Sequence, residues 1–120
     1  FDIKSNHINE YLDDITSKHE KVTAKDFRTW AATWKTAFRL SKQIDPDTNH
    51  ARKRTLNEVI KTVSSDLGNT PTVCRSSYIH PIILSDWSEG IFRSKWNRAS
   101  RSRKMKGLSA EETTTLQYLE

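Results

Sequence analysis

The feature of this 120-residue chain that most restricts its fold is a short segment bounded by two helix breaks. Gly68 follows an apolar helical pattern, and because glycine has no Cβ it tolerates the left-handed conformation that ends a helix. Thr70 and Pro71 come next and are typical of an N-cap and a first helical position. The residue before Pro81 is displaced from the α region. These signals predict a short helix that starts at Pro71 and carries Tyr78 close to its end.

Two long apolar stripes with helical spacing precede this segment. The helix that carries the first stripe is predicted to begin near Thr23, and the helix that carries the second is predicted to run from about Asn49 to Leu67. The first stripe consists of Phe27, Trp30, Ala31, Trp34, Ala37 and Phe38. The second stripe consists of Leu56, Val59, Ile60, Val63 and Leu67. Stripes of this kind bury one face of a helix, so we expect these two helices to supply much of the core.

Shorter patterns predict the remaining helices. One is expected from about residue 6 to 14, another begins near Pro81, and a last one runs from Ser109 to about Leu119. Ser109 and Glu112 have the spacing of a capping box, which supports the start of the last helix. No convincing strand follows residue 5. The predicted fold class is therefore all-α, a compact bundle of about five or six helices.

The net charge of +5 is concentrated in one stretch. Residues 93–106 contain seven Lys or Arg and no acidic residue. We expect this stretch to be helical, within a basic extension (residues 85–120) of a helical subdomain (residues 1–84). A localised basic block is typical of polyanion binding, so we predict DNA-backbone contacts by Arg101, Arg103 and Lys104. The alternative is a solvated helix face that only keeps the protein soluble.

Composition argues against several classes of protein and site. No apolar run approaches the roughly 20 residues that span a bilayer, and no signal peptide is expected. The single cysteine, Cys74, cannot form an internal disulfide and fits a reducing compartment. The four histidines have no cysteine partners at zinc-site spacing, and the three glycines form no phosphate-cradling loop. The sequence therefore predicts no membrane segment, no metal and no cofactor.

Two segments carry a resemblance to a known family. They are Thr23-Ala-Lys-Asp-Phe-Arg-Thr-Trp30 and Leu67-Gly-Asn-Thr-Pro-Thr-Val-Cys-Arg-Ser-Ser-Tyr-Ile-His-Pro81. In residue type, order and separation they resemble type IB DNA topoisomerases, especially the bacterial and poxvirus-like branch. The resemblance covers roughly residues 6–84. It implies a C-terminal catalytic fragment of an enzyme that relaxes supercoiled DNA through a 3′-phosphotyrosyl intermediate and religation, without ATP or metal.

The same resemblance implies a catalytic role for three residues: Tyr78 as the nucleophile, Arg28 on the scissile phosphate, and Asn69 where many members carry His. A phenol with a pKa near 10 is a weak nucleophile at neutral pH, so the site must stabilise charge on the phosphate. The planar guanidinium of Arg28 matches two phosphate oxygens. Asn69 can donate a hydrogen bond but cannot act as an acid.

Further expectations follow from the resemblance. Lys25, Thr70 and Arg75 are expected to contact the DNA backbone. The family's second arginine and its general-acid lysine lie N-terminal to the Arg-Thr segment, and no residue here matches their motifs. We therefore expect this chain, which begins with Phe1, to be part of a longer enzyme with an otherwise incomplete site. The expected partner is double-stranded DNA, the expected state is a monomer, and the expected location is the bacterial cytoplasm with the nucleoid.

Two alternatives remain open. Tyrosine recombinases share the phosphotyrosine chemistry, but they usually carry His-x-x-Arg where this chain has Lys25-Asp-Phe-Arg28. They also favour Leu-Gly-His where this chain has Leu67-Gly-Asn69, so both differences favour a topoisomerase. The other alternative is a non-catalytic, basic helical DNA-binding module. Such a module predicts salt-dependent affinity without a covalent adduct.

Overall fold

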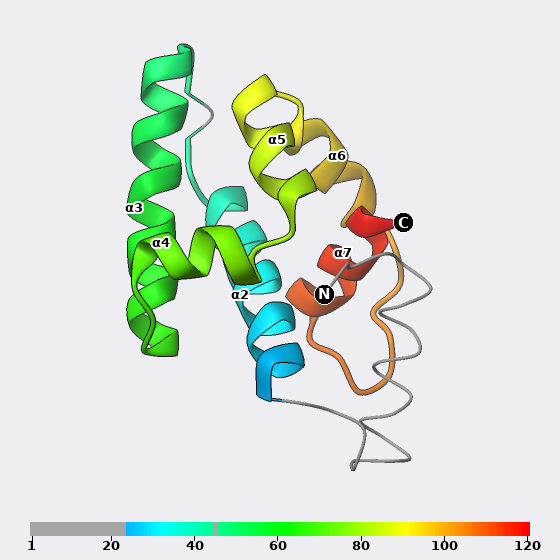
Figure 1. Ribbon diagram of the computed structural model, residues 1–120. Helices are drawn as coiled ribbons and strands as arrows, with labels where there is room; N and C mark the ends of the chain where they lie inside the picture. The colour runs from blue at the N-terminus through cyan, green and yellow to red at the C-terminus, as the bar shows by residue number, and fades with distance from the viewer. Residues whose placement is uncertain (1–23, 45) are drawn as a thin grey trace.

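The computed structural model describes residues 24–44 and 46–120, which form helices joined by short connections (Figure 1). These described residues contain six α-helices and one π-helix, and no strand. The all-α prediction is therefore confirmed for this part of the chain. The helix expected at residues 6–14 lies outside the described residues. No helix in the described ranges has both the length and the apolar character needed to cross a membrane.

The two longest helices of the described residues are α2 (Ala24–Ser41) and α3 (Asn49–Leu67), which pack against each other. The ends of α3 follow from its capping residues. The Thr48 hydroxyl accepts a hydrogen bond from the Ala51 amide at 3.1 Å, which satisfies one free donor of the first turn. Gly68 adopts φ 73° and ψ 28°, the left-handed conformation predicted for the end of this helix.

The short helix predicted after Gly68 has two parts, α4 (Pro71–Val73) and the π-helix η2 (Cys74–Tyr78). Thr70 is its N-cap, as predicted, and its hydroxyl accepts from the Val73 amide at 3.2 Å. The π-helical turn was not predicted. It closes when the Ile79 amide donates to the Cys74 carbonyl, five residues earlier, at 3.1 Å. A π-helical turn is rare and often marks a functional site.

Three shorter helices complete the described chain: α5 (Pro81–Glu89), α6 (Phe92–Ala99) and α7 (Ala110–Leu119). The predicted capping box at Ser109 and Glu112 is present in both directions. The prediction that the basic stretch continues as helix is wrong beyond Ala99, because residues 100–109 form a non-helical loop. Residues 100–104 include no apolar side chain, so a helix there would have no face to bury.

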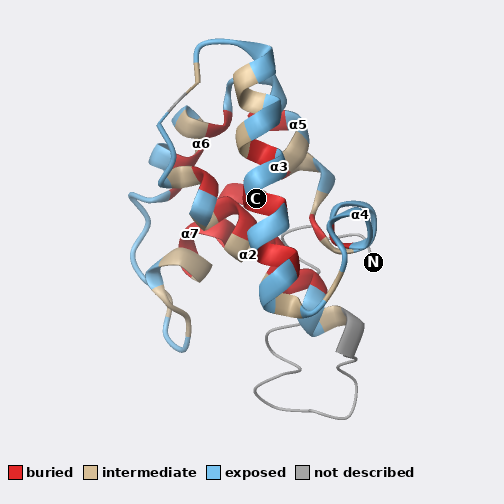
Figure 2. Ribbon diagram, turned by 90° about the vertical axis from the view of Figure 1, so that its left-hand side faces the viewer, coloured by how far each residue is buried: buried red, intermediate tan, exposed pale blue. Residues whose placement is uncertain are grey.

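The buried face of α2 differs from the predicted apolar stripe. Trp30 and Ala37 are buried, but Phe27 is 48% exposed. The buried face instead includes Thr29, Ala32, Thr33, Thr36, Ala37 and Leu40. Three threonines point inward because α2 is covered on more than one side, by α3, η2 and α7 (Figure 2). A prediction from hydropathy alone counts threonine as a polar, exposed residue and therefore misses this buried face.

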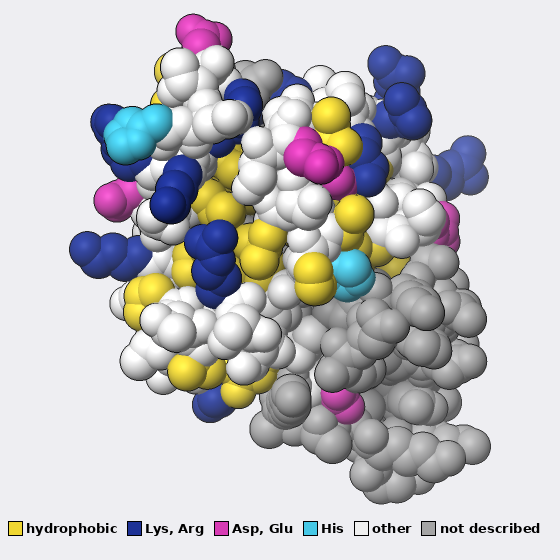
Figure 3. All heavy atoms as spheres, turned by 45° about the horizontal axis from the view of Figure 1, so that its top comes forward, with side chains coloured by type: hydrophobic (Ala, Val, Ile, Leu, Met, Phe, Trp, Pro, Cys, Tyr) yellow, Lys and Arg dark blue, Asp and Glu magenta, His cyan; other side chains and the backbone are white. Residues whose placement is uncertain are grey.

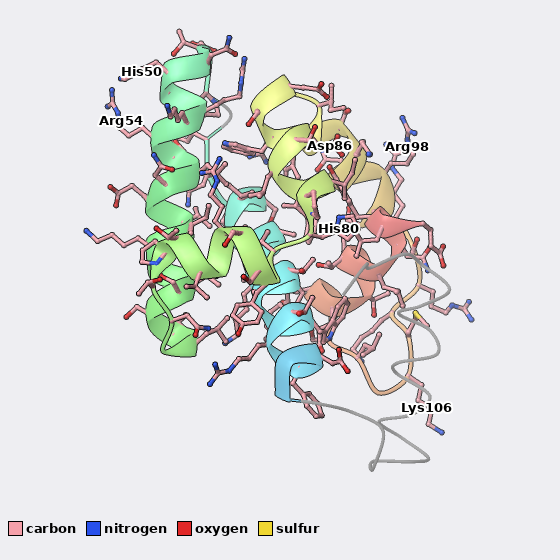
Figure 4. The ribbon with its side chains drawn as sticks, viewed as in Figure 1. His50, Arg54, His80, Asp86, Arg98 and Lys106 are labelled. Atoms are coloured by element: carbon pink, nitrogen blue, oxygen red, sulfur yellow. The ribbon has the colours of Figure 1, made fainter. Side chains whose placement is uncertain are left out.

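A buried polar network ties the last three helices together. Asp86 on α5 accepts hydrogen bonds at Oδ2 from the Tyr118 hydroxyl of α7 at 2.7 Å and from the Lys95 Nζ of α6 at 2.6 Å. The Tyr118 ring also packs against Phe92, with a centroid distance of 5.2 Å. Figure 4 shows Asp86 where α5 lies beside α6. A buried carboxylate with two donors holds the C-terminal helix in place.

This network predicts a stability loss at alkaline pH. Burial, and then the hydrogen bond to Asp86, raise the pKa of the Tyr118 phenol above its ordinary value of 10.0. The folded state therefore keeps a proton that the unfolded state releases near pH 10. The stabilising contribution is complete below about pH 10 and is lost as pH rises toward the folded-state pKa. Denaturant unfolding from pH 7 to 11 should show a loss of free energy of unfolding in the wild type.

The matched variant is Tyr118→Phe, which keeps the ring and removes the titrating group. At pH 7 it should cost about 1.5 to 3 kcal/mol, because a hydrogen bond to a charged group is lost. Above pH 10 its free energy of unfolding should fall less steeply than that of the wild type. Parallel pH profiles for the two proteins would show that Tyr118 contributes nothing to the alkaline transition.

Candidate functional site

The fold brings Arg28 and Asn69 into contact. The N-terminal end of α2 and the C-terminal end of α3 lie at the same end of the molecule (Figure 1). Arg28 is exposed on the second turn of α2, and its Nη1 donates to the Asn69 Oδ1 at 3.4 Å across 41 residues of sequence. The main chain of Asn69 is held by the end of α3, because its main-chain amide donates to the Ser64 carbonyl at 2.9 Å. Two of the three predicted catalytic residues therefore form a pair.

The contact with Arg28 fixes the orientation of the Asn69 side-chain amide. A guanidinium only donates hydrogen bonds, so the amide oxygen must face it and the amide nitrogen must face elsewhere. That nitrogen, Nδ2, is buried and has no hydrogen-bond partner among the described residues. Buried donors are usually paired, because an unmade hydrogen bond costs free energy. Among the described residues, the site therefore holds a buried donor without an acceptor, next to the positive charge of Arg28.

Tyr78 ends the π-helix η2 and packs, partly buried, against the main hydrophobic core. Its main chain is attached to α2, the helix that also carries Arg28. The Thr33 hydroxyl donates to the Tyr78 carbonyl at 3.2 Å and accepts from the His80 amide at 3.2 Å. In Figure 4, His80 lies where the chain passes from η2 to α5. The three segments that carry Arg28, Asn69 and Tyr78 are thus joined through α2.

The neighbours of Tyr78 have mainly structural contacts. Cys74 is fully buried, and burial raises the pKa of its thiol. The Thr70 hydroxyl accepts the capping bond of α4, which leaves its own hydrogen available to a ligand. Arg75 is exposed and donates to the Asn57 Oδ1 of α3 at 3.3 Å. The Lys25 side chain lies outside the described residues.

The predicted DNA contacts Arg101, Arg103 and Lys104 lie elsewhere in the fold. All three are exposed in the loop of residues 100–109, between α6 and α7. Figures 1 and 2 both place this loop and the α4–η2 segment on opposite sides of α2. The labelled Lys106 of the same loop lies far from η2 in Figure 4. The structure therefore does not bring these three residues to Tyr78.

Part of the basic stretch serves the fold itself. Arg93 donates to the main-chain carbonyls of Ser41, at 3.1 Å, and of Gln43. Lys95 is bound to the buried Asp86. On the face drawn in Figure 3, Lys and Arg side chains of the molecule occupy several separate places and form no continuous patch. Charge counted along the sequence thus overstates the charge that this stretch offers to a ligand.

Within residues 24–44 and 46–120, no three side chains of His, Cys, Asp or Glu gather in a way that could hold a metal ion. Thr33 and the π-helical turn were not predicted from the sequence. One signal was present: Thr29, Thr33 and Thr36 repeat at helical spacing on an otherwise apolar helix. Residues at that spacing share one face of a helix, so the repeat marks the face but not the contact that Thr33 makes.

Comparison with known protein families identifies the family of the chain. A model of the family described as eukaryotic DNA topoisomerase I, catalytic core, matches residues 1–105. The matched range includes Arg28, Asn69 and Tyr78 and ends in the loop before α7. No curated protein sequence matches the chain.

Proposed function

The chain belongs to the family of the eukaryotic DNA topoisomerase I catalytic core, and from this membership we propose that it acts on double-stranded DNA as part of a type IB topoisomerase. The proposed reaction is relaxation of supercoiled DNA by transient cleavage of one strand and religation. The observation that carries the proposal is the Arg28–Asn69 pair with its unpaired amide nitrogen. Because this nitrogen is buried, it would donate to a phosphate oxygen bound beside Arg28 once the Asn69 side chain turns its amide toward the ligand.

The proposed chemistry is a transesterification at phosphorus. The Tyr78 oxygen forms a bond to the phosphorus, the phenol loses its proton, and the bond from phosphorus to the 5′ oxygen breaks. The 5′ oxygen takes a proton from the general-acid lysine of the complete enzyme and leaves as a hydroxyl, and the 3′ end remains attached to Tyr78 through the phosphate. Religation reverses these steps, so the energy of the phosphodiester is kept in the phosphotyrosine and no ATP is required. Arg28 would stabilise the charge on the non-bridging oxygens as it develops.

The complete enzyme, in this proposal, joins the chain to the segment that supplies a second arginine and a general-acid lysine. The matching family is described as eukaryotic. We nevertheless propose the bacterial and poxvirus-like branch, because the segments around Arg28 and Tyr78 resemble that branch. Such an enzyme would act as a monomer on the nucleoid in the cytoplasm, where the free Cys74 stays reduced.

The test is formation of a covalent complex. The complete enzyme is mixed with a nicked duplex from which the cleaved 5′ fragment escapes, and the products are separated under denaturing conditions. We expect a protein–DNA adduct without ATP and in the presence of a metal chelator. DNA that binds in native gels but never becomes covalently attached would favour the non-catalytic module. A recombinase would also form an adduct, so the test is completed by relaxation of supercoiled plasmid without exchange of strands between two duplexes.

The loop of residues 100–109, which carries Arg101, Arg103 and Lys104, has a separate test. Replacing Arg101, Arg103 and Lys104 together with Gln should weaken binding similarly on unrelated duplexes, because phosphate contacts carry little sequence information. Each lost contact should reduce the log–log salt slope by about 0.9. The measurement is DNA affinity across a salt series for the wild type and the triple variant. Because the loop lies across α2 from Tyr78, the cleavage rate of pre-bound complexes should be unchanged.

The control removes the same charge from another surface, by replacing the exposed Lys53, Arg54 and Lys61 of α3 with Gln. If the loop contacts DNA, the loop variant should have the smaller salt slope of the two. Equal slopes for both variants would show an effect of net charge alone. A loop variant that matches the wild type would remove the loop from the DNA interface.

A further inference from the structure

The main chain around Tyr78 depends on one side chain of α2. The Thr33 oxygen makes two hydrogen bonds, as donor to the Tyr78 carbonyl and as acceptor from the His80 amide, each at 3.2 Å. Thr33 is fully buried. The two main-chain groups flank Ile79, the residue at which the chain leaves the helix with φ −83° and ψ 130°. A single hydroxyl thus fixes both sides of the helix break.

The Tyr78 carbonyl has no helical partner that could replace Thr33. In a continued α-helix it would accept from the Ile82 amide, and in a continued π-helix from the Ile83 amide. The Ile82 amide donates instead to the His80 Nδ1 at 3.0 Å. The Ile83 amide donates to the His80 carbonyl at 3.1 Å. Both amides are used to start α5, so the end of η2 is held from outside, by α2.

We propose that Thr33 is a positioning residue for Tyr78. The inference rests on the proposed role of Tyr78 as the nucleophile. Arg28 and Thr33 are five residues apart on α2, which is about 7.5 Å along the helix axis. One helix therefore carries the phosphate-binding side chain and holds the main chain of the attacking residue. Shifts of about 1 Å in such an arrangement can reduce a rate by about a hundredfold.

The decisive variant is Thr33→Val in the complete enzyme, because valine keeps the branched shape and loses only the oxygen. We expect the single-turnover cleavage rate at saturating enzyme to fall by about 10- to 100-fold. The equilibrium affinity for the same DNA should stay close to that of the wild type, since Thr33 is buried and cannot touch DNA. Thr33→Ser keeps the hydroxyl and should restore most of the rate.

The chain offers a matched control on the same helix. Thr36 is also fully buried, but its Oγ1 has no hydrogen-bond partner in the described part of the chain. Thr36→Val should leave both cleavage and thermal stability unchanged or slightly increase stability, because an unpaired buried hydroxyl is removed. Comparing the two valine variants separates the loss of this hydrogen bond from the general effect of replacing a buried threonine.

The outcomes distinguish this inference from the proposed function. If Thr33→Val cleaves at the wild-type rate at a temperature where it is folded, while Tyr78→Phe forms no adduct, the inference is wrong and the function stands. If Tyr78→Phe still forms the adduct, the proposed function itself is wrong. If Thr33→Val does not fold, Thr33→Ala replaces it, because alanine also lacks the oxygen that makes both hydrogen bonds. A wild-type rate for Thr33→Ala would then overturn the inference.

Discussion

Replacing Tyr78 with phenylalanine should abolish the covalent adduct and leave non-covalent DNA binding nearly unchanged. The ring of Tyr78 packs against the main core, and phenylalanine keeps that packing. The bond from Thr33 is made to the main-chain carbonyl, so the substitution does not remove it. Only the attacking oxygen is lost. The measurement compares adduct yield in denaturing gels with affinity in native gels, using the same nicked duplex.

Tyr118→Phe is the matched control for this experiment. Tyr118 is buried, its hydroxyl donates to Asp86, and its raised pKa disfavours a phenolate, so it cannot serve as the nucleophile. That variant should form the adduct at a temperature where it remains folded. An adduct formed by Tyr78→Phe would show that the nucleophile is misassigned.

Replacing Arg28 with alanine should slow cleavage by about a hundredfold or more, the effect typical of losing a group that stabilises transition-state charge. Two contributions are lost, the charge of Arg28 and the orientation of the Asn69 side-chain amide, which Arg28 holds through a 3.4 Å hydrogen bond. Arg28→Lys should recover little of the rate, since an ammonium cannot reproduce the planar fork of a guanidinium. Single-turnover cleavage rates at saturating enzyme provide the measurement.

Arg39→Ala is the control for Arg28. Arg39 lies on the same helix, is exposed, and bridges to α3 through Asp66 at 3.3 Å. It therefore has the helix, the charge and a cross-helix contact in common with Arg28, but it lies three turns away, beyond Thr33. An exposed ion pair of this kind contributes at most about 1 kcal/mol, so the fold should survive its loss.

A fully active Arg28→Lys variant would contradict the assignment, because it would show that Arg28 supplies only general positive charge.

Helix boundaries were predictable because they depend on local residues. The Thr70 and Ser109 hydroxyls accept hydrogen bonds from main-chain amides three residues later, and Gly68 ends α3 in the left-handed conformation. All three act as the sequence indicated. The buried face of α2 was less predictable, because its threonines point inward only when other helices cover it. The prediction of helix beyond Ala99 was wrong, because residues 100–104 offer no apolar face to bury.

The candidate site was predictable in its parts but not in its assembly. Arg28 and Asn69 came from segment resemblance, and the structure shows them in contact. The support from Thr33 is a contact across 45 residues, between a side chain and a main-chain carbonyl that any residue type could present. No sequence pattern encodes such a contact. The π-helical turn likewise depends on how η2 meets α2, not on the residues of η2 alone.

The most direct test of the central claim is to identify the residue that becomes attached to DNA. The adduct is digested with nuclease and trypsin, and the nucleotide-bearing peptide is sequenced by mass spectrometry. Cleavage after Arg75 and Arg93 releases a peptide in which Tyr78 is the only tyrosine, while Tyr11 and Tyr118 fall in two other peptides. We expect the nucleotide on Tyr78 of the 76–93 peptide. A nucleotide on Tyr11 or Tyr118, or on Ser76 or Ser77 of that peptide, would contradict the assignment.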